Sequence, residues 1–163
     1  MKLIGAMLLL GSALFCGCAA ANRLRKHAAY LRLLRQFLTD LTNALRYTLP
    51  PVSDLLRSLA VHPAYQQLTF LQTAAEHADA FPESWQEAVR ADRQLTADAA
   101  PVMESVGQTL GATDLEGQLC ALKLCAERLA ALQADAEHTA KEKGDLYRSL
   151  GLFGGLFCVI LLL

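Results

Sequence analysis

The chain has 163 residues, of which 53% are hydrophobic, and its formal net charge is -1. Residues 23–46 carry six basic residues and one acid, whereas residues 51–137 carry five basic residues and thirteen acids, a net charge of 5 − 13 = -8. Nucleic-acid-binding proteins gather basic residues on the folded domain, so the acidic middle of this chain argues against that class. The length allows one ordinary domain, or a smaller domain with accessory segments.

Residues 3–22 form the first predicted element, an uncharged apolar segment that reads LIGAMLLLGSALFCGCAAAN. As a helix it would extend about 30 Å, which matches the hydrocarbon core of a bilayer. Arg23, Arg25 and Lys26 follow at once, and basic residues beside an apolar segment stay on the cytoplasmic side. We therefore expect residues 1–22 to be a retained transmembrane helix.

Two alternatives compete for the same segment. A cleaved signal peptide has a shorter apolar region before a small-residue cleavage site, and CGCAAAN resembles such a site. A lipoprotein signal would end at Cys16 or Cys18, but Phe15 lies where a small or aliphatic residue is normally needed. The basic flank favours the retained anchor.

The helical pattern continues beyond Arg23 to a pair of prolines. Apolar residues recur at steps of three and four, which places them on one stripe of a long helix. The stripe consists of Leu24, Ala28, Leu31, Leu34, Leu38, Leu41 and Leu45. Pro50 and Pro51 then end this helix.

Four short helices are predicted next, separated by prolines. They are expected from Val52 to Ala60, from Ala64 to Asp79, from Phe81-Pro82 with Trp85 and Val89 facing inward, and around Pro101 with Val102, Val106 and Leu110. Proline is favoured in the first turn of a helix and disfavoured inside it. No strand pattern is visible in this region.

A sixth helix, about fifty residues long, is predicted to run to the end of the chain. Gly111 is a suitable end for the fifth helix, and Thr113 to Glu116 (TDLE) has the form of a capping box. The spacing of Leu115, Leu119, Leu122, Ala126 and Leu129 is that of a bundle seam. Residues 149–163 are expected to be a second transmembrane helix, with residues 23–148 forming a cytoplasmic helical bundle between the two anchors.

These elements predict an all-α, six-helix antiparallel bundle whose first and last helices continue into the membrane. An even number of helices returns both chain ends to one side. Three connections then lie at the end far from the membrane, and we expect them to bind partner proteins. The candidate residues are Tyr47, Pro50, Pro51, Phe81, Pro82, Thr113 and Asp114.

Two further groups of residues are predicted to act at the membrane. Basic side chains are expected to contact lipid headgroups: Arg23, Arg25, Lys26, Arg32, Lys141, Lys143 and Arg148. Small residues four positions apart are expected to let the two membrane helices pack closely: Gly17, Ala21, Gly151 and Gly155.

Residues with catalytic or metal-binding potential do not form recognisable motifs. No phosphate-binding glycine loop and no His-Glu-x-x-His motif occurs in the sequence. His27, His62, His77 and His138 are scattered and are expected to be surface or capping residues. The five cysteines have no zinc-site spacing. We therefore expect a protein that is not an enzyme and that needs no cofactor or metal.

With its helices placed, the sequence resembles the stage III sporulation protein AB family. The resemblance is carried by LGATDLEGQ (residues 110–118), the closing YRSLGLFGGLFCVILLL from Tyr147, the N-terminal LIGAMLLLG and the central FPESW. One departure is visible. ALRYTLPPV has Ala44 where the family usually has Glu and Pro50 where it has Thr, so a partner contact made by that Glu is not expected here.

The resemblance implies a cytosolic helical bundle related to the cytoplasmic domains of the type II secretion platform protein. It also implies a structural role in the secretion-like channel between mother cell and forespore, at the mother-cell membrane facing the forespore. The implied partners are other channel subunits, including the secretion-type ATPase known as stage III sporulation protein AA. The alternative is a membrane-anchored signalling or receptor-accessory bundle.

Overall fold

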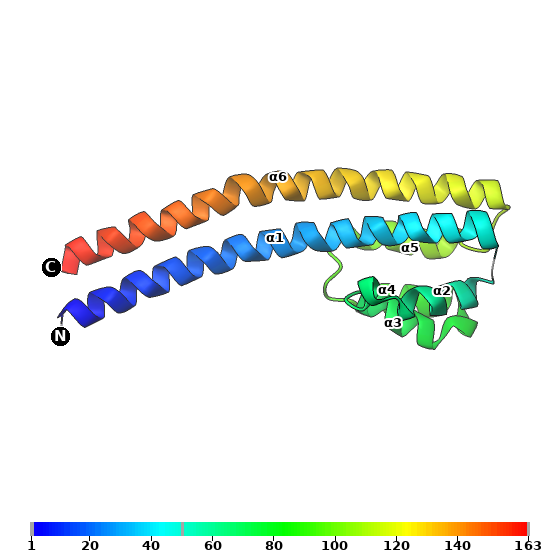
Figure 1. The fold of residues 1–163 in the computed structure, drawn as a ribbon, viewed down its shortest axis with the longest axis horizontal. Coiled ribbons are helices and arrows are strands. Elements are labelled where there is room, and N and C mark those ends of the chain that lie inside the picture. The colour runs from blue at the N-terminus through cyan, green and yellow to red at the C-terminus, as the bar shows by residue number, and fades with distance from the viewer. Residues whose placement is uncertain (1, 50, 163) are drawn as a thin grey trace. The chain divides into compact units, whose positions relative to one another are not determined.

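The computed structural model describes the backbone of residues 2–49 and 51–162, and the side chains of residues 12, 15, 17–47, 49, 51–144, 146, 147, 149, 150 and 153. Its described residues form six α-helices, two short 3-10 helices and no strand (Figure 1). In chain order they are α1 (Lys2–Thr48), α2 (Val52–Val61), η1 (Pro63–Tyr65), α3 (Thr69–Glu76), η2 (Ala78–Ala80), α4 (Glu83–Ala91), α5 (Ala100–Thr109) and α6 (Leu115–Leu162). The predicted all-helical class and the six α-helices are confirmed.

The chain divides into two compact units. One, here called the two-helix unit, consists of Met1–Tyr30 and Gln133–Leu163; the other, here called the core unit, is Leu31–Leu132. Both α1 and α6 therefore contribute one part to each unit. The four short α-helices and both 3-10 helices belong to the core unit.

In the two-helix unit, the parts of α1 and α6 run side by side at positions occupied by small residues (Figure 1). Ala21 and Ala140 are buried, and a Cβ atom at Gly144 would lie 3.8 Å from the Cβ of Ala21. That separation is an ordinary van der Waals contact. Ala21 and Gly144 thus allow the two backbones to approach closely.

The core unit is organised around Phe37, which α1 places among three aromatic rings. Edge-to-face contacts join Phe37 to Tyr65 at 5.6 Å and to Phe70 at 6.1 Å between ring centroids, and Phe70 lies 5.3 Å from Trp85. Such arrangements stabilise aromatic clusters beyond the burial of their area. The predicted apolar stripe of α1 is buried around them, from Leu31 to Leu45.

Trp85 joins α4 to α5. Its side chain is fully buried, its Nε1 donates a hydrogen bond to the Met103 carbonyl oxygen over 2.7 Å, and its ring lies directly over Gly107. The prediction that Trp85 and Val89 face inward is confirmed.

The third helix departs from the prediction. It begins at Thr69 rather than Ala64 and ends at Glu76 rather than Asp79, with 3-10 turns before and after it. The reason lies far along the chain: the Asp92 carboxylate accepts hydrogen bonds from the Thr69 hydroxyl (2.8 Å) and from the Phe70 backbone N–H (3.2 Å). This side chain satisfies a free donor in the first turn of α3 and so favours a start at Thr69.

Candidate partner-binding and membrane-facing surfaces

Two of the three predicted partner-binding loops lie close together in the core unit. A Cβ atom at Gly111 would lie 3.7 Å from Val52 Cγ2, so the connection before α2 meets the connection before α6. Tyr47 is 80% exposed, and Pro51, Thr113 and Asp114 are also exposed. Pro50 lies outside the described residues.

The third predicted partner-binding loop, which contains Phe81 and Pro82, is only partly accessible to a partner. Phe81 and Pro82 are half-buried, and the Phe81 ring lies 6.4 Å from Trp85. Phe81 is therefore committed in part to the core, because its ring completes the packing around Trp85.

The predicted capping box differs in detail. Helix α6 begins at Leu115, one residue later than a cap at Thr113 requires, and the Thr113 hydroxyl donates to the Asp114 carbonyl oxygen over 3.4 Å. The side chain that reaches back is Gln118, whose Nε2 donates to the Thr113 carbonyl oxygen over 2.7 Å. The Asp114 and Thr113 side chains lie against Gly117, where a Cβ would stand 2.8 Å from Asp114 Oδ1.

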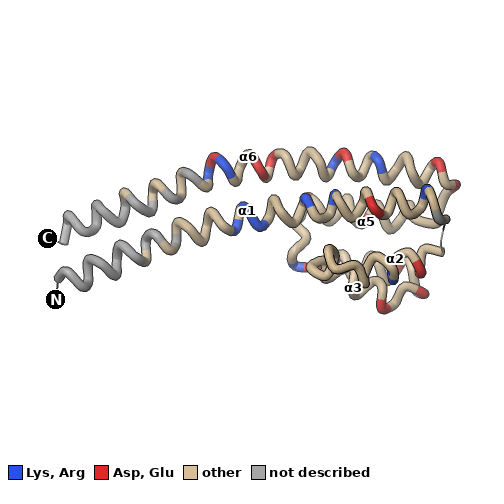
Figure 2. The backbone as a smooth tube through the Cα atoms, viewed as in Figure 1, with Lys and Arg blue, Asp and Glu red and all other residues tan. Residues whose placement is uncertain are grey.

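The predicted lipid-contact residues are exposed wherever the structure describes them. Arg23, Arg25 and Lys26 lie on α1, and Lys141 and Lys143 on α6, all within the two-helix unit (Figure 2). Arg32 is exposed in the core unit. The side chain of Arg148 lies outside the described residues.

Some of the residues predicted to pack the two membrane helices closely lie outside the described side chains. Ala21 is buried and Gly17 half-buried, while Gly151 and Gly155 lie outside that set. The small residue that meets Ala21 is Gly144, which the four-residue spacing of small residues did not indicate.

Large apolar side chains are exposed on both helices of the two-helix unit. They are Phe15, Leu146, Tyr147, Leu150 and Phe153. Among the described residues, no helix combines the length and apolar character needed to cross a membrane.

Two buried side chains in the core unit, Tyr65 and Cys125, have raised pKa values. Burial, and then the hydrogen bond that its hydroxyl donates to the Asp40 carboxylate, raise the pKa of Tyr65 well above its usual value. Burial likewise raises the pKa of the Cys125 thiol, although a hydrogen bond with Ser105 acts in the opposite direction. These are features of a packed core rather than of a reactive centre, because each shift favours the neutral group.

The histidines behave as predicted where the structure describes their contacts. The His62 Nδ1 accepts the backbone N–H of Ala64 over 3.3 Å, and His138 faces Glu142 at 3.5 Å. Within the described part of the chain, no group of three or more histidine, cysteine or acidic side chains is arranged to hold a metal ion.

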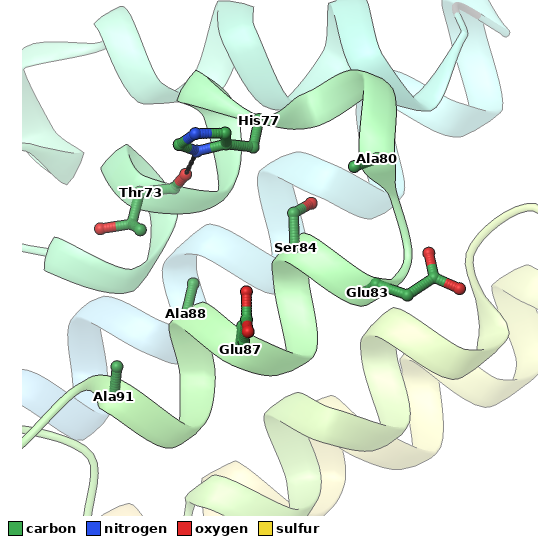
Figure 3. A pocket seen from close by; sticks show the side chains of 8 residues that line it. All are labelled: Thr73, His77, Ala80, Glu83, Ser84, Glu87, Ala88 and Ala91. Atoms are coloured by element: carbon green, nitrogen blue, oxygen red, sulfur yellow. Dashed lines mark hydrogen bonds between the residues drawn. The ribbon is translucent and has the colours of Figure 1, made fainter.

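The core unit also contains a pocket of about 510 Å³ between α3, η2 and α4 (Figure 3). Thr73 and His77 lie on one side of it, and α4 contributes Glu83, Ser84 and Glu87 on the other. Sequence patterns did not indicate this site, because its residues come from three elements whose packing is tertiary.

Comparison with known proteins extends over the entire chain. The family model described as "Stage III sporulation protein AB" matches residues 2–163. A relative named stage III sporulation protein AB, from Bacillus subtilis (strain 168), is 25% identical over 170 residues, covering 100% of this chain and 99% of the relative. A solved structure of stage III sporulation protein AB (SpoIIIAB) aligns with a TM-score of 0.55 and 24% identity over 69% of this chain and 94% of that chain. The chain therefore belongs to the stage III sporulation protein AB family.

Proposed function

We propose that the protein is a non-catalytic structural component of a secretion-like channel between mother cell and forespore. The observation that carries this proposal is the family match over residues 2–163. Membership places the chain among sporulation proteins, a family not known for enzymatic activity. In this role the core unit is a platform on which other channel subunits assemble, including the secretion-type ATPase subunit.

The proposal includes two membrane anchors, residues 1–22 and 149–163, with residues 23–148 in the mother-cell cytoplasm. It is supported by the exposed apolar side chains of the two-helix unit, such as Phe15 and Phe153, and by the exposed basic side chains nearby. Basic residues beside an anchor remain on the cytoplasmic side and attract anionic headgroups. In the proposed arrangement, Arg23, Arg25 and Lys141 contact these headgroups.

The surface proposed for the ATPase subunit comprises the connection before α2 and the connection before α6. Its support is the proximity of Val52 to Gly111, which joins the two connections into one surface. Tyr47 contributes the largest exposed aromatic side chain to this surface, and aromatic residues are enriched among those that dominate binding energy.

Affinity purification of the full-length chain with the ATPase subunit tests this proposal. The double variant Tyr47→Ala/Asp114→Ala should reduce recovery of the subunit by about tenfold, the loss expected when one dominant contact is removed. Val61→Ala is the matched control, because Val61 is equally exposed but lies at the other end of α2. Equal recovery by all three proteins would contradict the platform surface.

A further inference from the structure

The pocket between α3, η2 and α4 has an apolar floor and an acidic rim. Ala80, Ala88 and Ala91 contribute the apolar lining, whereas Glu83 and Glu87 bring two carboxylates to its edge (Figure 3). Its volume of about 510 Å³ is within the range of pockets that bind ligands. The pocket can therefore accept a long side chain whose stem is apolar and whose end is polar.

The two carboxylates lack compensating charge. Glu83 and Glu87 are exposed, lie one turn apart on α4, and form no ion pair with any residue that the structure describes. The nearby Arg57 and Arg90 are engaged elsewhere, Arg57 with Asp79 at 2.7 Å and Arg90 with Glu104 at 3.0 Å. Like charges one turn apart repel each other, so a bound cation would relieve this repulsion.

Ser84 adds an independent sign of a missing partner. Ser84 is only 9% exposed, and its Oγ atom has no hydrogen-bond partner among the described residues. In a helix a serine hydroxyl commonly bonds the carbonyl four residues earlier, but α4 begins at Glu83, so Ser84 lies in the first turn. Figure 3 shows the side chain projecting toward the segment that carries Ala80 and His77.

Buried polar groups are nearly always satisfied, and an exception calls for an explanation. Ser84 is one of the residues that line the pocket, together with Glu87 and His77. There its hydroxyl would accept a hydrogen bond from a donor that enters the pocket. A cationic donor can satisfy this hydroxyl and a carboxylate at once.

We propose that this pocket binds an arginine or lysine side chain presented by a segment of a partner protein. The guanidinium group of arginine has five donors in a fixed fork, enough to bond carboxylate and hydroxyl oxygens together. Its aliphatic stem packs against the alanine floor, as such stems do on apolar surface. A protein segment is the occupant because the lining residues Thr73, Ala80 and Ala91 are small, so a backbone can approach closely.

The charge of this region favours the same kind of partner. The core unit, residues 31–132, carries eight basic and twelve acidic residues, a net charge of 8 − 12 = -4, which attracts basic segments and disfavours acidic ones. A metal ion is not the proposed occupant, because the described residues contain no group of ligands that could hold one. The proposal stands whether or not the protein is part of a channel, since it rests on the core unit alone.

Selection of short random peptides displayed on phage, with the full-length protein in detergent micelles as bait, tests the pocket. The expected result is a set of peptides that share one arginine or lysine. In fluorescence anisotropy, replacing that arginine with citrulline, or the lysine with norleucine, should weaken binding about tenfold or more, as should Glu83→Gln/Glu87→Gln in the protein.

Two further variants separate pocket binding from general attraction. Ala91→Leu, at an exposed lining position, narrows the pocket without changing the charge and should also weaken binding about tenfold. Glu116→Gln/Glu127→Gln makes the same charge change on exposed positions of α6 and should leave binding unchanged. Circular dichroism confirms that each variant is folded.

The proposal is overturned if no peptide is recovered, or if the recovered peptides tolerate loss of their cation. Equal loss of binding in the α6 control would overturn it as well, since it would show that only net charge matters. None of these results bears on recovery of the ATPase subunit through Tyr47 and Asp114, so failure here is distinguishable from failure of the proposed channel role.

Discussion

Trp85 is the residue whose surroundings are most tightly specified. A hydrogen bond to Met103, the Phe70 ring and the α5 backbone at Gly107 all limit its position. Packing this close requires glycine at position 107, since any Cβ there would occupy the space of the indole. Rigid aromatic neighbours cannot yield as flexible side chains do.

Gly107→Ala should therefore destabilise the protein. The added Cβ would lie 2.2 Å from Trp85 Cδ1, and overpacking of this kind costs about 1–3 kcal/mol. The measurement is urea unfolding followed by circular dichroism.

Gly117→Ala serves as the comparison for Gly107→Ala. Its closest contacts would be the Asp114 Oδ1 and Thr113 Oγ1 atoms, at 2.8 and 3.0 Å, which belong to exposed side chains that can rotate. The change in unfolding free energy should stay below about 1 kcal/mol. Equal losses in both variants would contradict the role assigned to the Trp85 contact.

The contact between Tyr65 and Asp40 makes the free energy of unfolding depend on pH in the alkaline range. The pKa of Tyr65 is raised by burial, by the hydrogen bond to Asp40 and by the charge of Asp40. The unfolded chain therefore loses the phenol proton near pH 10, before the folded chain does. The stabilisation is fully present below about pH 10 and is lost as pH rises toward the folded-state pKa.

Tyr65→Phe should lower the free energy of unfolding at pH 8 by about 1–3 kcal/mol, because it removes a hydrogen bond to a carboxylate. It should also make the decline above pH 10 shallower than in the unmodified protein. Urea unfolding at pH 8 and at a series of pH values above 10 measures the free energy of unfolding and its decline. Tyr47→Phe, which changes an exposed side chain, should leave both quantities unchanged, and an unaltered pH slope in Tyr65→Phe would refute the linkage.

Among the helices, α5 ends at Thr109, and Gly111, the residue that the sequence indicated as a helix end, lies two positions beyond it. The residue has φ +77°, in the left-handed region that glycine adopts without steric cost. Space is available at this position, because the nearest atom to an added Cβ is Val52 Cγ2 at 3.7 Å. The need for glycine is therefore conformational rather than steric.

Gly111→Ala should destabilise the protein by about 1–2 kcal/mol, the cost of placing an ordinary residue in the left-handed region. Gly111→Asn should cost less, since asparagine tolerates this conformation. Thermal unfolding of the two variants measures the difference. If asparagine were the more damaging substitution, crowding against Val52 would be the better explanation.

The first turn of α3 shows the limit of local sequence rules. Sequence patterns placed its start at Ala64, directly after Pro63, because His62-Pro63 was expected to end the preceding helix. The observed start at Thr69 depends on Asp92, which is more than twenty residues away. No local pattern contains that information.

For the molecule as a whole, the cysteines provide a test of the proposed placement of the core unit in the cytoplasm. Cys120 is exposed on α6, whereas Cys125 is buried and its pKa is raised. In a variant whose only cysteine is Cys120, a membrane-impermeant maleimide should label the protein in lysed cells but not in intact spheroplasts.

A variant with Cys125 alone provides the control for this labelling experiment. Its thiol should react only after denaturation, because burial blocks the reagent and disfavours the reactive thiolate. Labelling of Cys120 in intact spheroplasts would place the core unit outside the membrane and contradict the proposed topology.

The sequence by itself determined the helical class, the stripe from Leu31 to Leu45, the break near Pro51 and the turn at Gly111. It also carried the motifs that resemble the sporulation family, which the match over residues 2–163 confirms. These features are local: periodicity, proline and glycine act within a few residues, and motifs are contiguous.

Only the tertiary structure decided which distant side chains meet. Phe37 among the aromatic rings, Asp92 at the start of α3 and Gly144 against Ala21 all join residues far apart in the chain. Periodicity assigns a residue to a face of a helix but does not specify its neighbour. That choice depends on how complete helices pack, which follows from the shapes of all their side chains together.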